Sequence, residues 1–237
     1  MSLFTSRSTA IEIMDDLQCS GEVVNQTLRE LEIINRLLGG NHVTINGVRQ
    51  LLKNRKTTYP ITIADLGCGG GDILKLVAAW GRKNKIPLQL TGIDANSNII
   101  DYAVKYSGDY PEINYTAVNI FSSEFTQQSH DIVLATLFTH HFTSEELIHL
   151  LRQLKSHTHT GIVINDLHRH WLAYYSIKWL TQLFSKSAMV KTDAPLSVLR
   201  GFKKQELTGI LKQAGIENYT LRWRWAFRWE LIINTTP

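Results

Sequence analysis

The sequence has few cysteines, no long apolar run and no long block of charge of one sign. Its two cysteines, Cys19 and Cys68, lie far apart without metal-ligand spacing, so neither a disulfide framework nor a zinc site is predicted, and no metal is expected. No stretch approaches the roughly 18 apolar residues that span a bilayer. The N-terminus also lacks the pattern of a signal peptide. These absences predict a cytoplasmic protein without a membrane span.

The charge is mild and the composition is that of a globular protein. The 25 Lys and Arg residues exceed the 21 Asp and Glu residues by +4, and the basic residues are scattered apart from two short clusters. This distribution argues against a nucleic-acid partner. With 43% hydrophobic residues, the 237-residue chain can bury a sizeable core. One larger α/β domain with an additional lobe is expected.

Residues 1–58 are predicted to form an N-terminal helical segment that acts as part of a lid. Apolar residues at helical spacing predict two or three helices there. These residues are Ile11, Ile13, Met14, Leu17, Leu28, Leu31, Ile34, Leu37 and Leu38. Gly39 and Gly40 should end the second helix, and the basic stretch 53–58 is predicted to be a linker. The apolar helices are also compatible with a homodimer.

Residues 59–237 alternate short β-branched runs with helical segments, which predicts a parallel sheet with helices on both faces. The expected strands are Ile61–Leu66, Leu88–Ile93, Ile113–Ile120, Asp131–Leu137 and Gly161–Asp166. The expected helices between them are Gly71–Lys83, Asn98–Tyr106 and Ser144–Ser156. A ligand should lie at the carboxyl ends of such strands.

The strand rhythm is interrupted at about 168–202, where we expect a lid insertion. It should begin with the aromatic helix Trp171–Phe184 and continue as an irregular stretch around Pro195. A helix over Lys204–Ala214 and two antiparallel strands within Tyr219–Asn234 then complete a doubly wound α/β fold. The tryptophans of this tail, Trp223, Trp225 and Trp229, are expected to pack on the sheet.

The most specific motif is the glycine loop of residues 65–72, Asp-Leu-Gly-Cys-Gly-Gly-Gly-Asp, between a predicted strand and a predicted helix. Glycines let the backbone turn sharply and approach a ligand, and the helix start offers free amides. A dinucleotide-binding loop would need a third glycine at position 72, where Asp72 would repel a pyrophosphate. A cofactor without phosphates is therefore favoured.

Asp94 ends the second predicted strand, one strand-helix-strand repeat after the loop. A carboxylate there can accept hydrogen bonds from both hydroxyls of a ribose. The alternative is that Asp94 begins a turn or caps the following helix. Its pairing with the glycine loop favours the ribose.

At these residues the sequence resembles the class I S-adenosylmethionine-dependent methyltransferases, whose first motif matches Asp65, Gly67, Gly69 and Gly71. The resemblance implies S-adenosyl-L-methionine as the cofactor and a seven-stranded Rossmann-like sheet whose last strand is antiparallel. It also implies a set of cofactor-binding residues: Asp65, Gly67, Cys68, Gly69, Asp94, Ala95, Asn119, Ile120 and Ala135. Asn119 stands where many members carry an Asp, and its side-chain oxygen can also accept from an adenine amine.

Residues 137–142, Leu-Phe-Thr-His-His-Phe, resemble the small-molecule branch related to quinone-biosynthesis methyltransferases. Segments 14–16, 34–40, 166–169 and 199–202 are similar to bacterial methyltransferases of aromatic polyketide pathways. The resemblance implies an apolar, aromatic acceptor such as a phenol, polyketide or quinol. O-methylation is expected, with C-methylation of a quinone precursor as the alternative.

Three histidines are candidates for the base that removes a proton from the acceptor: His140, His141 and His168. His140 and His141 follow the fourth strand, and His168 follows the fifth, where Asp166 is placed to orient a histidine or to cap the lid helix. The alternative is that these histidines are structural. The lid aromatics are expected to line the acceptor pocket, unless they are ordinary core residues.

Three rival functions remain. A nucleic-acid methyltransferase is disfavoured because residues 135–138, Ala-Thr-Leu-Phe, stand where amino-group methylation needs an Asn/Asp-Pro-Pro-aromatic segment. An oxidoreductase is disfavoured by the missing third glycine. A non-catalytic cofactor-binding module has the same binding motif, so that only an assay separates it from the enzyme.

Overall fold

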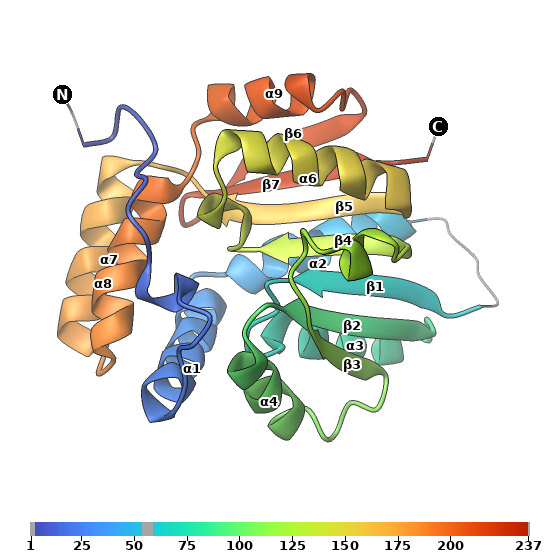
Figure 1. The fold of residues 1–237 in the computed structure, drawn as a ribbon, viewed down its shortest axis with the longest axis horizontal. Helices are drawn as coiled ribbons and strands as arrows, with labels where there is room; N and C mark the ends of the chain where they lie inside the picture. Colours follow the sequence, from blue (N-terminus) through green and yellow to red (C-terminus); the bar gives the residue numbers. More distant parts are fainter. Residues whose placement is uncertain (1–2, 54–58, 237) are drawn as a thin grey trace.

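The computed structural model describes residues 3–53 and 59–236, and its centre is a seven-stranded sheet (Figure 1). The strands are β1 (Ile61–Leu66), β2 (Leu88–Asp94), β3 (Ile113–Ala117), β4 (His130–Thr136), β5 (Thr158–Leu167), β6 (Tyr219–Arg224) and β7 (Arg228–Asn234). Their order is β3-β2-β1-β4-β5-β7-β6. The first five pair in parallel, and β7 runs antiparallel to β5 and β6. The predicted doubly wound, seven-stranded α/β fold is confirmed.

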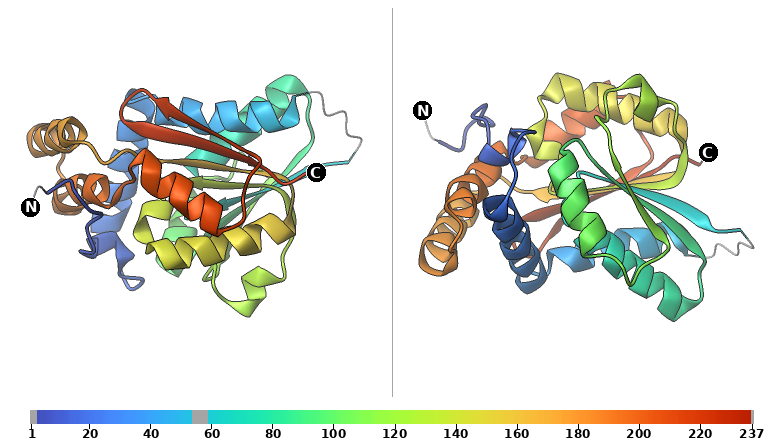
Figure 2. Two further views of the ribbon diagram at one scale, coloured as in Figure 1. Left: turned by 90° about the horizontal axis from the view of Figure 1, so that it is seen from above. Right: turned by 60° about the horizontal axis from the view of Figure 1, so that its bottom comes forward.

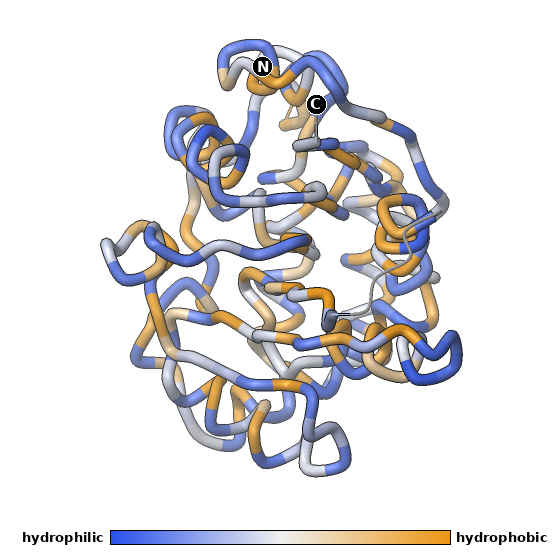
Figure 3. The backbone as a smooth tube through the Cα atoms, turned by 90° about the vertical axis from the view of Figure 1, so that its right-hand side faces the viewer, coloured by the Kyte–Doolittle hydropathy of each residue, from blue (hydrophilic) through white to orange (hydrophobic). Residues whose placement is uncertain are grey.

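Helices cover both faces of the sheet (Figure 2). One face packs against α2 (Gly40–Leu52), α3 (Asp72–Asn84) and α4 (Ser97–Lys105). The other packs against α5 (Ser123–Thr126), α6 (Ser144–His157) and α9 (Lys204–Gln213). Because the central strands are covered twice, side chains of both parities are buried, as with Ile63 and Leu66 of β1 at 0% exposure. The turns of the outer helices alternate between hydrophobic and hydrophilic residues (Figure 3), as expected for helices with one buried side.

A third group of helices lies beyond one end of the sheet (Figure 1). It consists of α1 (Glu22–Leu37), α7 (Trp171–Phe184) and α8 (Ala188–Arg200), where α8 packs on both α1 and α7. The segment before α1, residues 3–20, crosses this group as a strap with a single 3₁₀ turn at Ile13–Asp15. The Asp193 carboxylate of α8 accepts the amide protons of Ile13 and Met14, both at 3.0 Å. Two segments distant in sequence therefore meet over the strand ends.

Several expectations about local structure are wrong. The stretch around Pro195 is not irregular but lies inside α8, because Met189, Val190 and Val198 bury one side of that helix and outweigh the missing proline amide. The helical spacing that begins at Ile11 produces only the three-residue 3₁₀ turn at Ile13–Asp15 before α1, and no α-helix. Ile11 is 79% exposed, and the segment is held by hydrogen bonds to Asp193 and by the packing of Met14 against a small apolar cluster with α1 and α8.

Two further differences concern the strand ends and the tail. β3 ends at Ala117 rather than Ile120 because its one neighbour in the sheet, β2, ends at the paired residue Asp94. Of the tail tryptophans, Trp229 is buried, but Trp223 and Trp225 are 47% and 75% exposed. The predicted linker at 53–58 lies outside the described residues apart from Lys53, which directly follows α2. No described helix combines the length and the apolar character needed to cross a membrane.

Candidate active site

A cavity of about 760 Å³ lies at the carboxyl ends of the parallel strands, between the sheet and the helices α1, α7 and α8. Its lining includes most of the sequence-predicted site residues: Asp65, Gly67, Cys68, Gly69, Asp94, Ala95, Asn119, Ile120, His140 and His141. Two are not part of the lining. Ala135 is buried within β4, and His168, which directly follows β5, accepts a hydrogen bond from Trp223 Nε1 at 3.3 Å.

The glycine loop leaves β1 with a backbone that glycine is suited to adopt. Gly67 and Gly69 have φ values of +65° and +51°, in the left-handed region. A side chain at Gly67 would also overlap the ring of Phe138, which packs against the loop. The sharp turn brings the loop backbone to the wall of the cavity and leads into α3, whose N-cap is Gly71.

Two carboxylates lie next to this loop. Asp94 is largely buried at the end of β2, which raises the pKa of its carboxyl group, while amides of Asn96, Gly69 and Ala95 oppose the rise. Asp65 is fully buried, its Oδ1 atom has no hydrogen-bond partner among the described residues, and burial raises its pKa well above the ordinary value. An orphaned oxygen at a cavity wall fits a ligand with a positively charged or hydroxyl donor.

Asn119 and Cys68 complete this end of the cavity. Asn119 Oδ1 accepts the amide proton of Phe121 at 2.9 Å, which leaves it one further lone pair. The thiol of Cys68 is buried, and burial together with Asp94 and Asp65 raises its pKa well above the ordinary value. The thiol is therefore protonated and unsuited to nucleophilic attack.

At the other end of the cavity, His140 is held by Asp166. Its Nδ1 atom lies 2.7 Å from Asp166 Oδ1, and its own amide donates to Asp166 Oδ2 at 3.0 Å. Asp166 is buried, which would raise its pKa, but the charge and hydrogen bond of His140 and the hydroxyl of Thr139 hold it below its usual range. The predicted pairing of Asp166 with a histidine is present, although the partner is His140 rather than the neighbouring His168. Asp166 does not cap α7, whose cap is the side chain of His170.

Two buried polar atoms at this end of the cavity have no hydrogen-bond partner among the described residues. One is the Nε2 atom of His140, which lies 3.6 Å from the other, Glu12 Oε1. Burial raises the pKa of Glu12 to about 7. A buried donor or acceptor without a partner is costly, so this gap is suited to a ligand atom.

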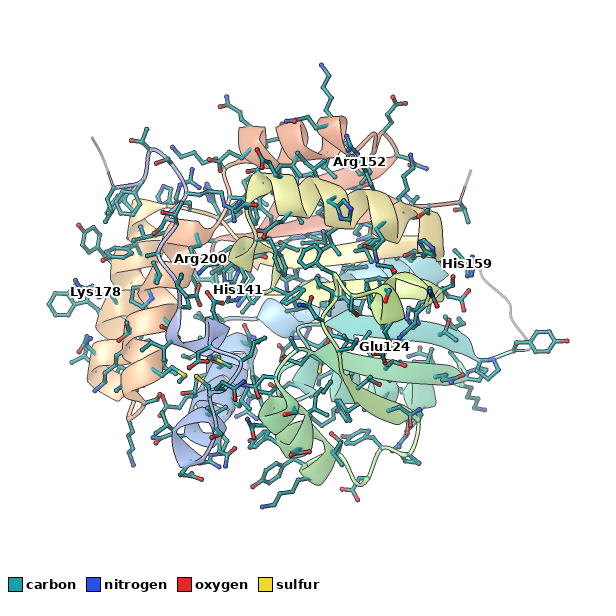
Figure 4. The ribbon with its side chains drawn as sticks, in the orientation of Figure 1. Glu124, His141, Arg152, His159, Lys178 and Arg200 are labelled. Atoms are coloured by element: carbon teal, nitrogen blue, oxygen red, sulfur yellow. The ribbon has the colours of Figure 1, made fainter. Side chains whose placement is uncertain are left out.

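His141 faces Asp15 instead. Its Nδ1 atom lies 2.5 Å from Asp15 Oδ1, and Arg200 donates to Asp15 Oδ2 at 2.7 Å. Burial would raise the pKa of Asp15, but the hydrogen bond and charge of His141 hold it below its usual range. Figure 4 shows Arg200 and His141 together between α8 and the sheet, and an Arg200 nitrogen donates to the His141 carbonyl at 2.6 Å.

One group of residues has donors suited to a metal ion. Glu12, His140 and His141 direct one ligand atom each into a region in which these atoms lie within 4.8 Å of one another. The guanidinium of Arg200 lies in the same region, with its Nε atom 3.6 Å from Glu12 Oε1. This permanent positive charge disfavours a second cation there.

The cavity also contains residues that the sequence analysis missed. Glu12 comes from the strap, where its place in a segment without regular structure gave no signal. Arg228 comes from the first position of β7 and belongs to one of the two short basic clusters, whose composition gave no sign of a role in the site. The lid helix α7 contributes Ala173, Ser176, Ile177 and Leu180 to the lining, not its aromatics. The expectation of an aromatic lining from α7 is therefore wrong: Trp171, Trp179 and Phe184 are 55–77% exposed.

Comparison with known proteins gives one family match, over part of the chain. Residues 63–161 match a family model described as a methyltransferase domain. This match covers less than half of the chain. A search of curated proteins found no match.

Many solved structures share the fold. Human N-acetylserotonin methyltransferase in complex with SAM superposes with a TM-score of 0.65 at 16% identity, covering 93% of this chain and 57% of that one. The plantazolicin methyltransferase BpumL in complex with a monoazolic desmethylPZN analog and SAH gives a TM-score of 0.64 at 19% identity, covering 90% of this chain and 89% of that one. The CMeT domain of the citrinin polyketide synthase gives 0.61 at 18%, covering 80% and 50%. The chain thus spans about half the length of two of these neighbours, and the likeness establishes the Rossmann-like methyltransferase fold.

Proposed function

We propose that the chain is an S-adenosylmethionine-dependent methyltransferase that methylates an oxygen atom of a small apolar, aromatic acceptor. The observation that supports this most is the single cavity, which joins the glycine loop and Asp94 at one end to the Asp166-oriented His140 at the other. Its volume of about 760 Å³ is within the roughly 300–1,000 Å³ typical of small-molecule sites. Solved structures of similar fold with bound SAM or SAH support the choice of cofactor.

The residues at the loop end fit this cofactor. The Asp94 carboxylate would accept from the ribose hydroxyls, and the orphaned Asp65 oxygen would receive the ammonium group. Asn119 and Ile120 would border the adenine, and Gly67 and Gly69 would let the backbone approach the amino-acid part. When bound, the cofactor supplies an electrophilic methyl group on a sulfonium.

The residues at the other end act on the acceptor. Asp166 Oδ1 accepts the Nδ1 proton of His140, which leaves the lone pair on Nε2, toward the cavity. This nitrogen accepts the proton of an acceptor hydroxyl as the oxygen attacks, and Asp166 stabilises the resulting imidazolium. We place His141 in a positioning role because its ring is bound to Asp15. His168 lies outside the cavity lining, so we assign it no proton transfer.

The strap and the helices α1, α7 and α8 would hold the acceptor and exclude water. They contribute mainly apolar side chains to the cavity, among them Met14, Leu28, Leu31, Ile177 and Val198. Arg7 secures the strap by donating to the carbonyls of His140 and Phe142 at 2.9 and 2.8 Å. We therefore treat the strap and α1, together with the insertion at 168–202, as the cover of the methyltransferase domain, whereas α2 packs against the sheet and belongs to that domain.

Methylation of carbon is the second candidate. One solved structure of similar fold, the CurJ carbon methyltransferase, is named for this reaction. The same His140 nitrogen can remove a proton from an activated carbon acid. Nuclear magnetic resonance of the product with a ¹³C-labelled methyl donor separates the two, because O-methyl and C-methyl carbons differ widely in chemical shift.

A transfer assay tests the proposal. The purified protein is incubated with S-adenosylmethionine labelled in the methyl group and a panel of phenols, hydroxypyrones and quinols. The expected result is label in at least one acceptor with wild type and its loss with His140→Ala, while S-adenosylhomocysteine binding is retained. Binding of the cofactor without transfer to any acceptor would favour the non-catalytic module, and a parallel loss of cofactor binding in His140→Ala would remove the base assignment.

A further inference from the structure

Arg228 is a buried cation that forms no direct ion pair with a described residue. The side chain is 2% exposed, and no carboxylate among residues 3–53 and 59–236 forms an ion pair with it. Its guanidinium donates to Asn35 Oδ1 at 2.6 Å and more weakly to Asn165 Oδ1 at 3.4 Å, while Nε has no partner. Burial lowers the pKa of Arg228 to about 10, against the opposing charge of the buried Asp166, so Arg228 remains charged at neutral pH. A buried charge without a direct ion-pair partner is costly unless a ligand supplies one.

The Arg228 guanidinium packs closely against the first residue of α2. Gly40 is the first residue of α2, and a side chain there would overlap the Arg228 guanidinium. Asn165 reinforces the contact by donating to the Gly40 carbonyl at 2.9 Å. The positive end of a 13-residue helix and a guanidinium therefore meet at one point of the fold, an arrangement that attracts an anion.

The turn that carries Arg228 is held in an unfavourable backbone conformation. Ala226 and Phe227, between β6 and β7, have φ values of 59° and 56°, which non-glycine residues rarely adopt. Both residues and the preceding Trp225 line the cavity together with Arg228. Residues with such strained backbone conformations are commonly found at active sites and ligand-binding sites.

Arg228 differs in the sign of its charge from the acidic residues that line the cavity. Its described lining contains six acidic residues, Glu12, Asp15, Asp65, Asp72, Asp94 and Asp193, and no lysine. Arg228 is the one arginine in that lining. Acidic groups suit the ammonium, sulfonium and hydroxyls of a ligand, but they repel a carboxylate. A ligand oxyanion within this cavity has one side chain of permanent positive charge to bind.

We propose that Arg228, presented by the strained β6–β7 turn against Gly40 and Asn35 at the start of α2, is an oxyanion-binding subsite that receives a carboxylate of the bound ligands. The planar fork of a guanidinium matches a carboxylate in two hydrogen bonds. This subsite rests on the proposed function for the identity of its ligands. The carboxylate comes from one of two sources, the amino-acid end of the cofactor or an acidic group on the acceptor.

Calorimetric titration distinguishes the sources. In the first arm, wild type, Arg228→Gln and Arg228→Lys are titrated with S-adenosylhomocysteine and with its decarboxylated analogue, which keeps the ammonium group. In the second arm, the same proteins are titrated with salicylate and with the neutral salicylamide, both with and without saturating S-adenosylhomocysteine. Arg222→Gln is the matched control, because Arg222 lies exposed on the same hairpin and away from the cavity.

The subsite predicts that wild type prefers the carboxylate form at least about tenfold in one arm and that Arg228→Gln abolishes this preference. Arg228→Lys should retain part of it, and Arg222→Gln all of it. The arm that shows the preference identifies the source. If Arg228→Gln folds poorly, Arg228→Lys decides, because a reduced preference is expected there and an undiminished one would overturn the subsite. Absence of any preference in both arms, or a preference that persists in Arg228→Gln, would overturn the subsite.

Failure of the proposed function would look different. Wild type would then bind neither adenosyl ligand, whereas the salicylate arm without S-adenosylhomocysteine would still report on Arg228.

Discussion

Replacing Asp166 by Asn should lower the turnover number about 10²–10³-fold while S-adenosylhomocysteine affinity changes less than about twofold. General-base catalysis contributes roughly 10²–10⁴-fold, and Asn retains part of the positioning, so the lower part of this range is expected. The loss corresponds to about 2.7–4 kcal/mol of activation free energy. The reason is structural, because Asp166 Oδ1 receives His140 Nδ1 at 2.7 Å and an amide group at this position would favour the wrong tautomer.

The assay is single-turnover transfer with saturating cofactor for Asp166→Asn, His140→Ala and the double variant, together with melting temperatures. Because the two residues act as one unit, the double variant should lose little more activity than His140→Ala alone. His168→Ala serves as the control and should retain wild-type turnover, since His168 does not line the cavity. Additive losses in the double variant, or a loss in His168→Ala equal to that in His140→Ala, would refute the reasoning.

Three further substitutions test other parts of the site. Asp94→Ala should weaken S-adenosylhomocysteine binding about 10–100-fold by calorimetry, whereas the exposed Asp101→Ala should not; equal affinities would exclude the ribose role. Gly67→Ala should abolish cofactor binding and lower the melting temperature, because Gly67 has a φ of +65° and a side chain there would overlap Phe138. Gly108→Ala, where a side chain would meet open space, should have neither effect. A Gly67→Ala protein with unchanged binding and melting temperature would contradict the loop geometry. Glu12→Gln should remove a pH dependence of stability. Burial raises the Glu12 pKa from 4.5 to about 7, so the stability it contributes is fully present below about pH 4.5 and is lost as the pH rises through 7. In urea denaturation the variant should match wild type near pH 4.5 and exceed it at pH 8.5 by up to about 3 kcal/mol, and a constant difference across this range would argue against the buried acid.

The sheet and the loop end of the site were predictable because their signals are local. β-branched runs alternating with amphipathic helices specify a parallel sheet. Gly67, Asp94 and Asn119 follow successive strands and therefore lie at one edge of that sheet, regardless of how the rest of the chain folds. The spacing of the glycines and the acid that follows them is likewise a property of consecutive residues. The structure accordingly places these residues around one cavity.

The acceptor end was less predictable because it depends on contacts between distant segments. Glu12 reaches His140 because contacts with distant residues hold the strap, among them those of Asp193 in α8, which span about 180 residues of sequence. Whether Asp166 pairs with His140 or with His168 depends on the directions of these side chains where β4 and β5 end. The alternation of side chains along a strand does not determine those directions, because both histidines lie beyond the strand ends. The aromatic residues of α7 have the same helical spacing whether they line the cavity or face solvent. Only the packing of the folded chain shows that several of them are exposed.

The most direct test of the account is a calorimetric titration of the wild-type protein with S-adenosylmethionine, S-adenosylhomocysteine and NADH in parallel. The account predicts binding of the first two with dissociation constants on the order of micromolar and no binding of NADH. Binding of NADH instead, or of none of the three, would contradict the assignment of the glycine loop and Asp94 to a phosphate-free adenosyl cofactor.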